Sequence, residues 1–107
     1  MTKCEFFREN ERITGFSVSG HSGYAEAGQD ILCASITAAV TLTEAIINDV
    51  CGGKAKVRVK EADARITLTL PTVCEEEEAI QAVLAGMMLY LLSLRDDYSD
   101  YIEVLEV

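Results

Sequence analysis

Apolar residues recur at two different spacings along this chain of 107 residues, and the order of these spacings limits the folds open to it. Apolar residues at every second position are typical of strands with one buried face. Apolar residues three and four positions apart are typical of helices. The order here is ββαββαβ. We therefore expect one domain, residues 1–107, of α/β (α+β) class, with two helices packed on a mainly antiparallel sheet.

The strand segments form two hairpins and one final strand. The first hairpin joins "KCEFF" (3–7) to "RITGFSVSG" (12–20) across the polar "RENE", and Gly15 is a candidate for a β-bulge. The second hairpin joins residues 54–62 to residues 64–71 and ends at Pro71. The alternating run "YIEVLEV" (101–107) predicts the last strand.

The helical segments have recognisable start and stop signals. We expect the first helix from Ile31 to Val50, with Asp30 as its N-cap and the glycines of "CGG" (51–53) as its stop. The second is expected over residues 79–94, after the four glutamates at 75–78, whose charge suits the positive end of a helix dipole. Its apolar run falls short of the roughly 20 residues of a membrane span, so we expect burial beneath the sheet or in a subunit contact.

Charge and composition restrict the partners. The formal charge of −9 repels phosphate backbones, so we expect no nucleic-acid partner, whereas a basic protein would be attracted. The first ten residues, "MTKCEFFREN", lack the apolar core of a secretory signal, and we expect a cytoplasmic protein that does not engage a membrane. Cysteines in that compartment are expected to be thiols. The four cysteines and one histidine lack zinc-site spacing, so we expect no metal and no cofactor.

One stretch, "GHSGYAEAGQDILCAS" (20–35), combines that histidine with a cysteine at a helix start. Cys33 falls in the first turn of the expected helix, where unpaired N–H groups favour the nucleophilic thiolate. His21 is separated from it by a loop long enough to bring the two side chains together, so the imidazole can act as a proton acceptor. Asp30 is either an orienting group for His21 or only a helix cap.

Packing is the alternative interpretation of both residues. Free cysteines are among the most buried residue types, and a loop histidine needs no special role. Cys4, Cys51 and Cys74 have no histidine nearby in sequence, and we assign them to packing.

The stretch at 20–35 resembles the signature of the ribosomal-processing cysteine protease Prp family, and the resemblance extends over essentially the whole chain. It implies a catalytic dyad of His21 and Cys33 and a helix-start acid at Asp30. Gly20, Gly23 and Gly28 would let the intervening loop open for a peptide and close over it. Thr37 stands where the family favours a serine, and its hydroxyl preserves a polar side chain there.

The resemblance also implies a substrate and an assembly. Members of the family remove the N-terminal extension of the bacterial large-subunit ribosomal protein L twenty-seven, cut beside aromatic residues, and are homodimers. A cysteine endopeptidase of this kind is our main hypothesis. The alternatives are a non-catalytic module that binds a ribosomal protein and, less strongly supported, a thiol redox sensor, for which no second cysteine lies close to Cys33.

Overall fold

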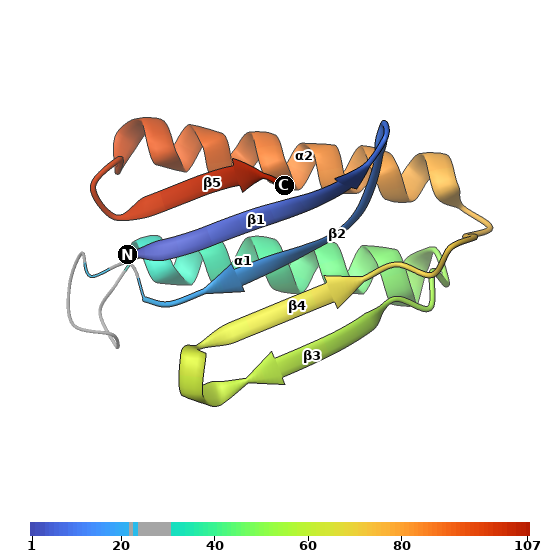
Figure 1. Cartoon of the computed structure of the whole chain (residues 1–107), viewed down its shortest axis with the longest axis horizontal. Helices are drawn as coiled ribbons and strands as arrows, with labels where there is room; N and C mark the ends of the chain where they lie inside the picture. Colours follow the sequence, from blue (N-terminus) through green and yellow to red (C-terminus); the bar gives the residue numbers. More distant parts are fainter. Residues whose placement is uncertain (22, 24–30) are drawn as a thin grey trace.

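The computed structural model of the chain describes residues 1–21, 23 and 31–107. Its strands are β1 (Thr2–Glu9), β2 (Arg12–Ser19), β3 (Lys56–Lys60), β4 (Arg65–Thr69) and β5 (Ile102–Glu106). Its helices are α1 (Ile31–Glu44), the π-helical η2 (Ala45–Val50), the short η3 (Glu61–Asp63) and α2 (Glu77–Asp97). The order ββαββαβ expected from the sequence is confirmed (Figure 1).

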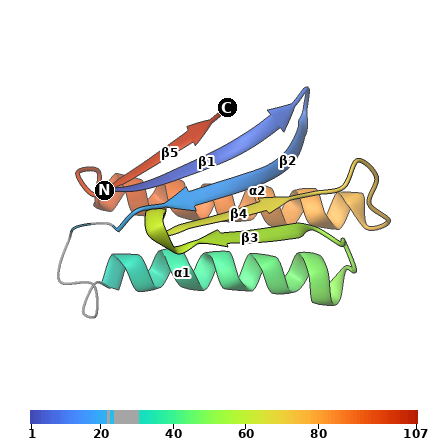
Figure 2. The same ribbon diagram turned by 60° about the horizontal axis from the view of Figure 1, so that its bottom comes forward.

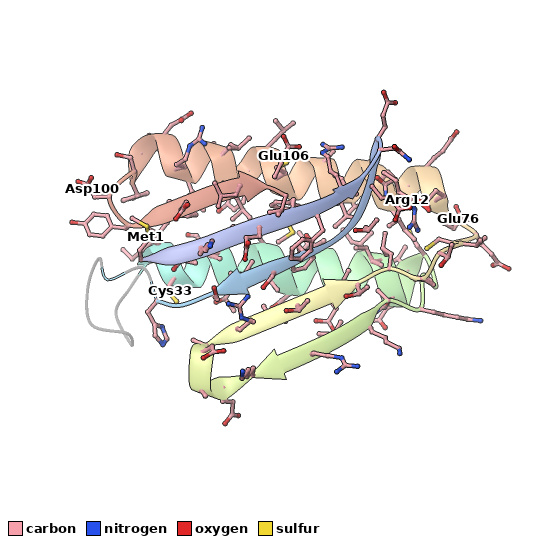
Figure 3. The ribbon with its side chains drawn as sticks, in the orientation of Figure 1. Met1, Arg12, Cys33, Glu76, Asp100 and Glu106 are labelled. Atoms are coloured by element: carbon pink, nitrogen blue, oxygen red, sulfur yellow. The ribbon has the colours of Figure 1, made fainter. Side chains whose placement is uncertain are left out.

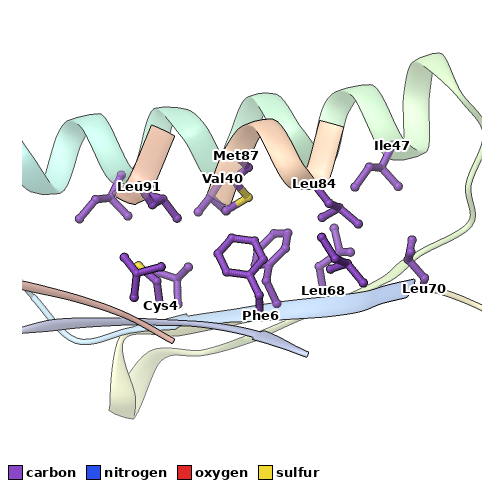
Figure 4. Close-up of a cluster of buried hydrophobic side chains, with 14 of the residues drawn as sticks. Cys4, Phe6, Val40, Ile47, Leu68, Leu70, Leu84, Met87 and Leu91 are labelled. Carbon is purple, nitrogen blue, oxygen red and sulfur yellow. The ribbon is translucent and has the colours of Figure 1, made fainter. Parts of the chain in front are cut away.

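The five strands form one sheet in the order β3-β4-β2-β1-β5. Three of the four strand pairs are antiparallel, and β1 with β5 is the parallel one. Both helices cover the same face of the sheet, so the molecule has two layers (Figures 2 and 4). This agrees with the expected α+β architecture. In the described part of the chain, no helix covers the other face of the sheet.

The core fills the space between the two helices and the sheet. Phe6 and Phe16 are both fully buried in it, with ring centroids 6.1 Å apart, and Figure 4 shows Phe6 across from Val40 and Met87. Each such large apolar side chain contributes about 1.5–3 kcal/mol on burial. The helical spacing of the buried residues therefore fixes which sides of α1 and α2 face the strands.

The β1–β2 hairpin is tighter than the polar run suggested. The strands continue to Glu9 and from Arg12, so only Asn10 and Glu11 form the turn, and Asn10 takes a left-handed φ of 58°. The expected bulge is present, because the register shifts where Gly15 lies opposite Phe7. A Cβ at Gly15 would lie 2.1 Å from the carbonyl oxygen of Leu68 on the neighbouring strand β4, so no side chain fits at this position.

The end of the first helix differs from the expected regular helix. Residues 45–50 form wider π-helical turns, followed by Gly52 at a φ of 62°. At this end the Asn48 side chain bonds both backbone groups of Ala55, accepting from its N–H (2.8 Å) and donating to its carbonyl (3.1 Å). Apolar spacing predicted the length of the helix but carried no signal for this wider turn.

The second helix is longer than expected. It starts at Glu77, which pairs with Arg12 (2.9 Å), and runs for 21 residues to Asp97. Our length argument against a membrane span was therefore wrong, since α2 and the helix at Ile31–Val50 are both long and apolar enough to cross a membrane by length and composition alone. Burial of Ile80 and Leu91 against the sheet agrees with the expected packing beneath it.

Burial of Cys4 gives a testable dependence of stability on pH. The side chain is fully buried in β1, and desolvation raises the pKa of Cys4 to about 12. The unfolded chain ionises from about pH 8.5, so stability is retained below that pH and falls by about 1.4 kcal/mol per pH unit as pH rises toward the folded pKa. Urea unfolding at pH 8 and pH 10 should show this extra loss in the wild type but not in Cys4→Val.

The control for Cys4→Val is Ile102→Val, a core change on β5 that removes no ionisable group. It should keep the wild-type dependence on pH. An identical loss of stability for wild type and Cys4→Val between the two pH values would contradict the assignment of Cys4 as a buried neutral thiol.

Candidate functional site

A cavity of about 240 Å³ lies between α1 and the sheet, beside the end of β2 and the start of β4. Cys33, His21, Thr37 and Gly20 all line it. The structure thus brings together four of the site residues predicted from sequence. Figure 3 shows Cys33 at the end of the molecule where the chain begins at Met1.

Cys33 occupies the first turn of α1. The helix begins at Ile31, so the backbone N–H groups of this turn have no intrahelical acceptor, and they and the helix dipole favour a negative charge. The side chain is half-buried, open to the cavity on one side and held by the helix on the other. A cysteine in this position is accessible to a substrate and lies beside the backbone N–H groups of the helix start.

His21 reaches the cavity because β2 ends in a sharp turn. Gly20 adopts a φ of 80°, and its N–H donates to the carbonyls of Asp63 and Ala64, both at 3.2 Å. A Cβ at Gly20 would lie 2.7 Å from the carbonyl oxygen of Met1, so both the turn and the close approach require glycine. His21 follows directly, exposed to solvent and lining the cavity.

The other predicted site residues divide into two groups. Thr37 lies one helical turn beyond Cys33, is exposed, and lines the cavity. Gly23 is exposed and has a φ of 74°, in keeping with its prediction as a conformationally permissive loop residue. Asp30 and Gly28 lie outside the described residues, so their predicted roles stay predictions.

Sequence reasoning missed several residues of the cavity wall. They come from the strands β1, β2 and β4, from the turn before β4 and from α1: Thr2, Val18, Ile36, Val40, Thr41, Ala64 and Ile66. Thr41 carried a signal, since it follows Cys33 and Thr37 at intervals of four on one helix face. The strand residues carried none, because only the pairing of β2 with β4 places Val18 beside Ile66.

Thr2 is unusual among the cavity residues. Its side chain is almost fully buried, and its hydroxyl oxygen has no hydrogen-bond partner among the described residues. A buried hydroxyl without a partner costs free energy, and bonding to a water or ligand atom in the cavity would recover it. The cavity wall therefore holds one polar group that is suited to an occupant.

The remaining cysteines lie apart from this cavity. Cys4 and Cys74 are buried and Cys51 is half-buried, and all three contact the core, which agrees with their assignment to packing. Within the described residues, no cluster of three or more histidine, cysteine or acidic side chains has the arrangement of a metal site.

A family model described as "Cysteine protease Prp" matches residues 1–103, which is nearly the entire chain. The chain belongs to the cysteine protease Prp family. The resemblance inferred from the stretch at 20–35 is thereby confirmed.

Individual relatives agree with the family assignment. The ribosomal processing cysteine protease Prp of Bacillus subtilis is 28% identical over 94 residues, which covers 86% of this chain and 84% of the relative. The crystal structure of Prp from Staphylococcus aureus with a covalently linked product peptide matches with a TM-score of 0.89 at 18% identity, each chain fully covered. A Streptococcus mutans protein matches with a TM-score of 0.87 at 17% identity, over 100% of this chain and 94% of its own. These structural matches show the shared fold.

The position of Cys33 predicts selective chemical modification. Cys33, at a helix start and open to the cavity, should react with iodoacetamide near pH 7 at least about tenfold faster than the buried Cys4 and Cys74 and than the half-buried Cys51, which packs against the core. Mass mapping of the native protein at short times measures this. Labelling in urea is the control and should make the four rates similar. First labelling at Cys4, Cys51 or Cys74 in the native protein would contradict it.

Proposed function

We propose that this ribosomal-processing cysteine protease family member is an endopeptidase with Cys33 as nucleophile and His21 as its base. The observation that carries the proposal is the shared cavity of about 240 Å³, which is lined by the only histidine and by the cysteine at the start of α1. Nucleophilic catalysis needs both groups to reach the same reacting atom, and this cavity provides one space open to both.

Cys33 and His21 can carry out both steps of the reaction, formation of a thioester and its hydrolysis. The Cys33 sulfur attacks the carbonyl carbon of the scissile bond, and His21 takes the thiol proton. N–H groups of the first turn of α1 stabilise the oxyanion. The carbon–nitrogen bond then breaks, and His21 gives its proton to the leaving amine. Water hydrolyses the resulting thioester with His21 again as base, releasing the second product and restoring the thiol.

Supporting groups follow from the cavity wall and from the family resemblance. Thr37 offers a hydroxyl one turn from Cys33 for a substrate carbonyl or for the His21 ring. Asp30 would cap α1 and orient His21. Gly20, Gly23 and Gly28 would permit the loop between His21 and Cys33 to open and close around the substrate. No step of this mechanism needs a cofactor.

The proposed substrate is the precursor of ribosomal protein L twenty-seven, cut at its N-terminal extension beside aromatic residues. The family resemblance supports this choice, and two properties of the chain are compatible with it. The charge of −9 favours encounter with a basic ribosomal protein. The cavity has apolar walls from Val18, Ile36, Val40 and Ile66, and burying an aromatic ring there contributes about 1.5–3 kcal/mol.

Incubation with a tagged precursor of the ribosomal protein tests this function. The wild type should release the extension, and Cys33→Ser and His21→Ala should reduce kcat/KM at least about a thousandfold while circular dichroism stays unchanged. Replacement of the aromatic residues beside the cut by alanine should lower kcat/KM about tenfold or more.

The contrary outcomes separate the hypotheses. Tight binding of the precursor without any cleavage by the wild type would favour the non-catalytic module. Substantial cleavage by Cys33→Ser would exclude a thiol nucleophile, and undiminished turnover by His21→Ala would require a different base.

We propose further that the protein acts as a homodimer in the cytoplasm. An apolar groove of about 390 Å³ runs between α1 and α2 and is lined by Leu42, Gly86 and Tyr90 among others. Leu42 and Tyr90 in this groove are 62% and 43% exposed, which is costly for side chains of this size in water. The family resemblance supports a second copy as the partner of this surface.

Disruption of the groove should separate the subunits. Leu42→Glu places a charge on this surface without entering the core, and sedimentation equilibrium at micromolar concentration should change from dimer to monomer. Val73→Glu, at an 82% exposed position outside both helices, is the matched control and should stay dimeric. A wild type that sediments only as a monomer would contradict the dimer.

A further inference from the structure

The outer edge of β3 is a free strand edge, and only β4 separates β3 from β2, the strand that leads to His21. β3 lies at one end of the sheet order, and among the described residues no strand pairs with its other side (Figure 2). Its residue Val59 lies directly opposite Ile66 of β4, and Ile66 lines the cavity that holds Cys33. Free backbone groups on such an edge are a template for another extended chain.

The hydrogen-bond pattern shows which groups of β3 face outward. The N–H of Leu70 donates to Thr14 (2.9 Å) and that of Gly20 donates to Ala64 (3.2 Å), so the even-numbered residues of β4 bond β2. Backbone bonding alternates along an antiparallel strand, and the odd-numbered residues of β4 therefore bond β3. Their partners in the register are Lys56, Arg58 and Lys60. The N–H and carbonyl groups of Val57 and Val59 consequently point away from the sheet.

One backbone position beside this edge already has a hydrogen-bond partner within the protein. Ala55, two residues before Val57, has both its N–H and its carbonyl bonded to the side-chain amide of Asn48 (2.8 and 3.1 Å). The amide thus acts as a strand partner at the first outward-facing position. The next two positions, Val57 and Val59, face no hydrogen-bond partner among the described residues.

The side chains of β3 differ sharply between its two faces. Val57 and Val59 lie on the helix-covered face, as do their register partners Leu68 and Ile66, yet Val59 is 68% exposed. Lys56, Arg58 and Lys60 alternate with them on the open face of the sheet and are exposed. Basic side chains on an edge oppose indiscriminate pairing, so a chain that adds here needs side chains that match both faces.

We propose that the polypeptide substrate binds as an additional strand on β3, paired with the backbone of Val57 and Val59. This rests on the proposed peptidase function and specifies how that site holds its substrate. Main-chain bonds would supply affinity independent of sequence, and alternate side chains would supply specificity. The substrate residue opposite Val59 points toward the helix-covered face, on the same side as the cavity, and is apolar. Its two neighbours lie over the basic open face and are neutral or acidic.

A proline substitution tests the main-chain pairing by removing a single backbone N–H group. Val59→Pro removes an N–H that points outward, so the bonds between β3 and β4 stay intact, and proline is tolerated on a strand edge in this position. We expect kcat/KM to fall about tenfold or more for Val59→Pro. Val59→Ala, which keeps the N–H and loses the same exposed side chain, is the matched control and should change it less than about threefold.

A binding measurement separates this proposal from the chemistry. Fluorescence anisotropy of a labelled substrate peptide on Cys33→Ala protein should show the same difference between the proline and alanine changes. If the wild type cuts no precursor, the proposed function fails. If the wild type cuts and Val59→Pro binds and cuts as well as Val59→Ala, the strand addition is wrong.

A second experiment leaves the protein unchanged, in case Val59→Pro unfolds. Substrate peptides N-methylated at one backbone position each should lose binding at every second position near the cut, because only alternate N–H groups of an added strand bond β3. Replacing a residue over the open face by lysine should weaken binding and glutamate should not. A loss that is uniform along the peptide, or preferred lysine at these positions, would overturn the proposal.

Discussion

The pairing of β2 with β4 is the constraint on which the site depends. These strands are separated in sequence by α1 and β3, and their pairing requires Gly15, where the carbonyl of Leu68 leaves no room for a Cβ. At the other end of the same pair, the N–H of Gly20 bonds the carbonyls of Asp63 and Ala64. His21 is thereby fixed at the rim of a cavity whose other wall is α1. If β2 and β4 were not paired this closely, His21 would lie on an ordinary surface turn.

Local patterns in the sequence predicted the helices and strands, because the spacing of apolar residues within one helix or strand reflects which of its faces is buried. The order ββαββαβ, the bulge at Gly15 and the helix start before Cys33 were all accessible in this way. The π-helical turn at 45–50 was not, because apolar spacing in the sequence does not distinguish this wider turn from an α-helical one. The same holds for Thr2, whose place in the cavity wall arises only from assembly of the sheet. Loop length and helix placement already suggested His21 and Cys33 as a pair, and the family resemblance favoured that interpretation over packing.

The formal net charge describes the local surface poorly, because the basic residues are concentrated in one part of an acidic chain. Five of the nine Lys and Arg residues lie between Lys54 and Arg65, in a chain whose formal charge is −9. Lys56, Arg58 and Lys60 share one face of β3, and Arg65 bonds Ser17 at 2.7 Å on the same side of the sheet. An incoming basic protein is thus attracted by most of the surface but repelled locally at this edge. In the proposed function, charge would therefore promote the encounter, whereas the basic edge would restrict which segment of the substrate can add to β3.

The position of Cys33 on α1 also explains how a cysteine that faces a cavity is compatible with a buried core on the same helix. Leu32, Ile36 and Val40 form the buried stripe of the helix at intervals of four, and Cys33, Thr37 and Thr41 follow one residue later. One residue corresponds to about 100° around a helix, so the second stripe lies at the border between the core and solvent. The core stripe holds the helix against the sheet, and the border stripe presents a sulfur and two hydroxyls to the cavity. A change of volume at Ile36 or Val40 would shift both stripes together, so packing and chemistry in this protein are set by the same turn of helix.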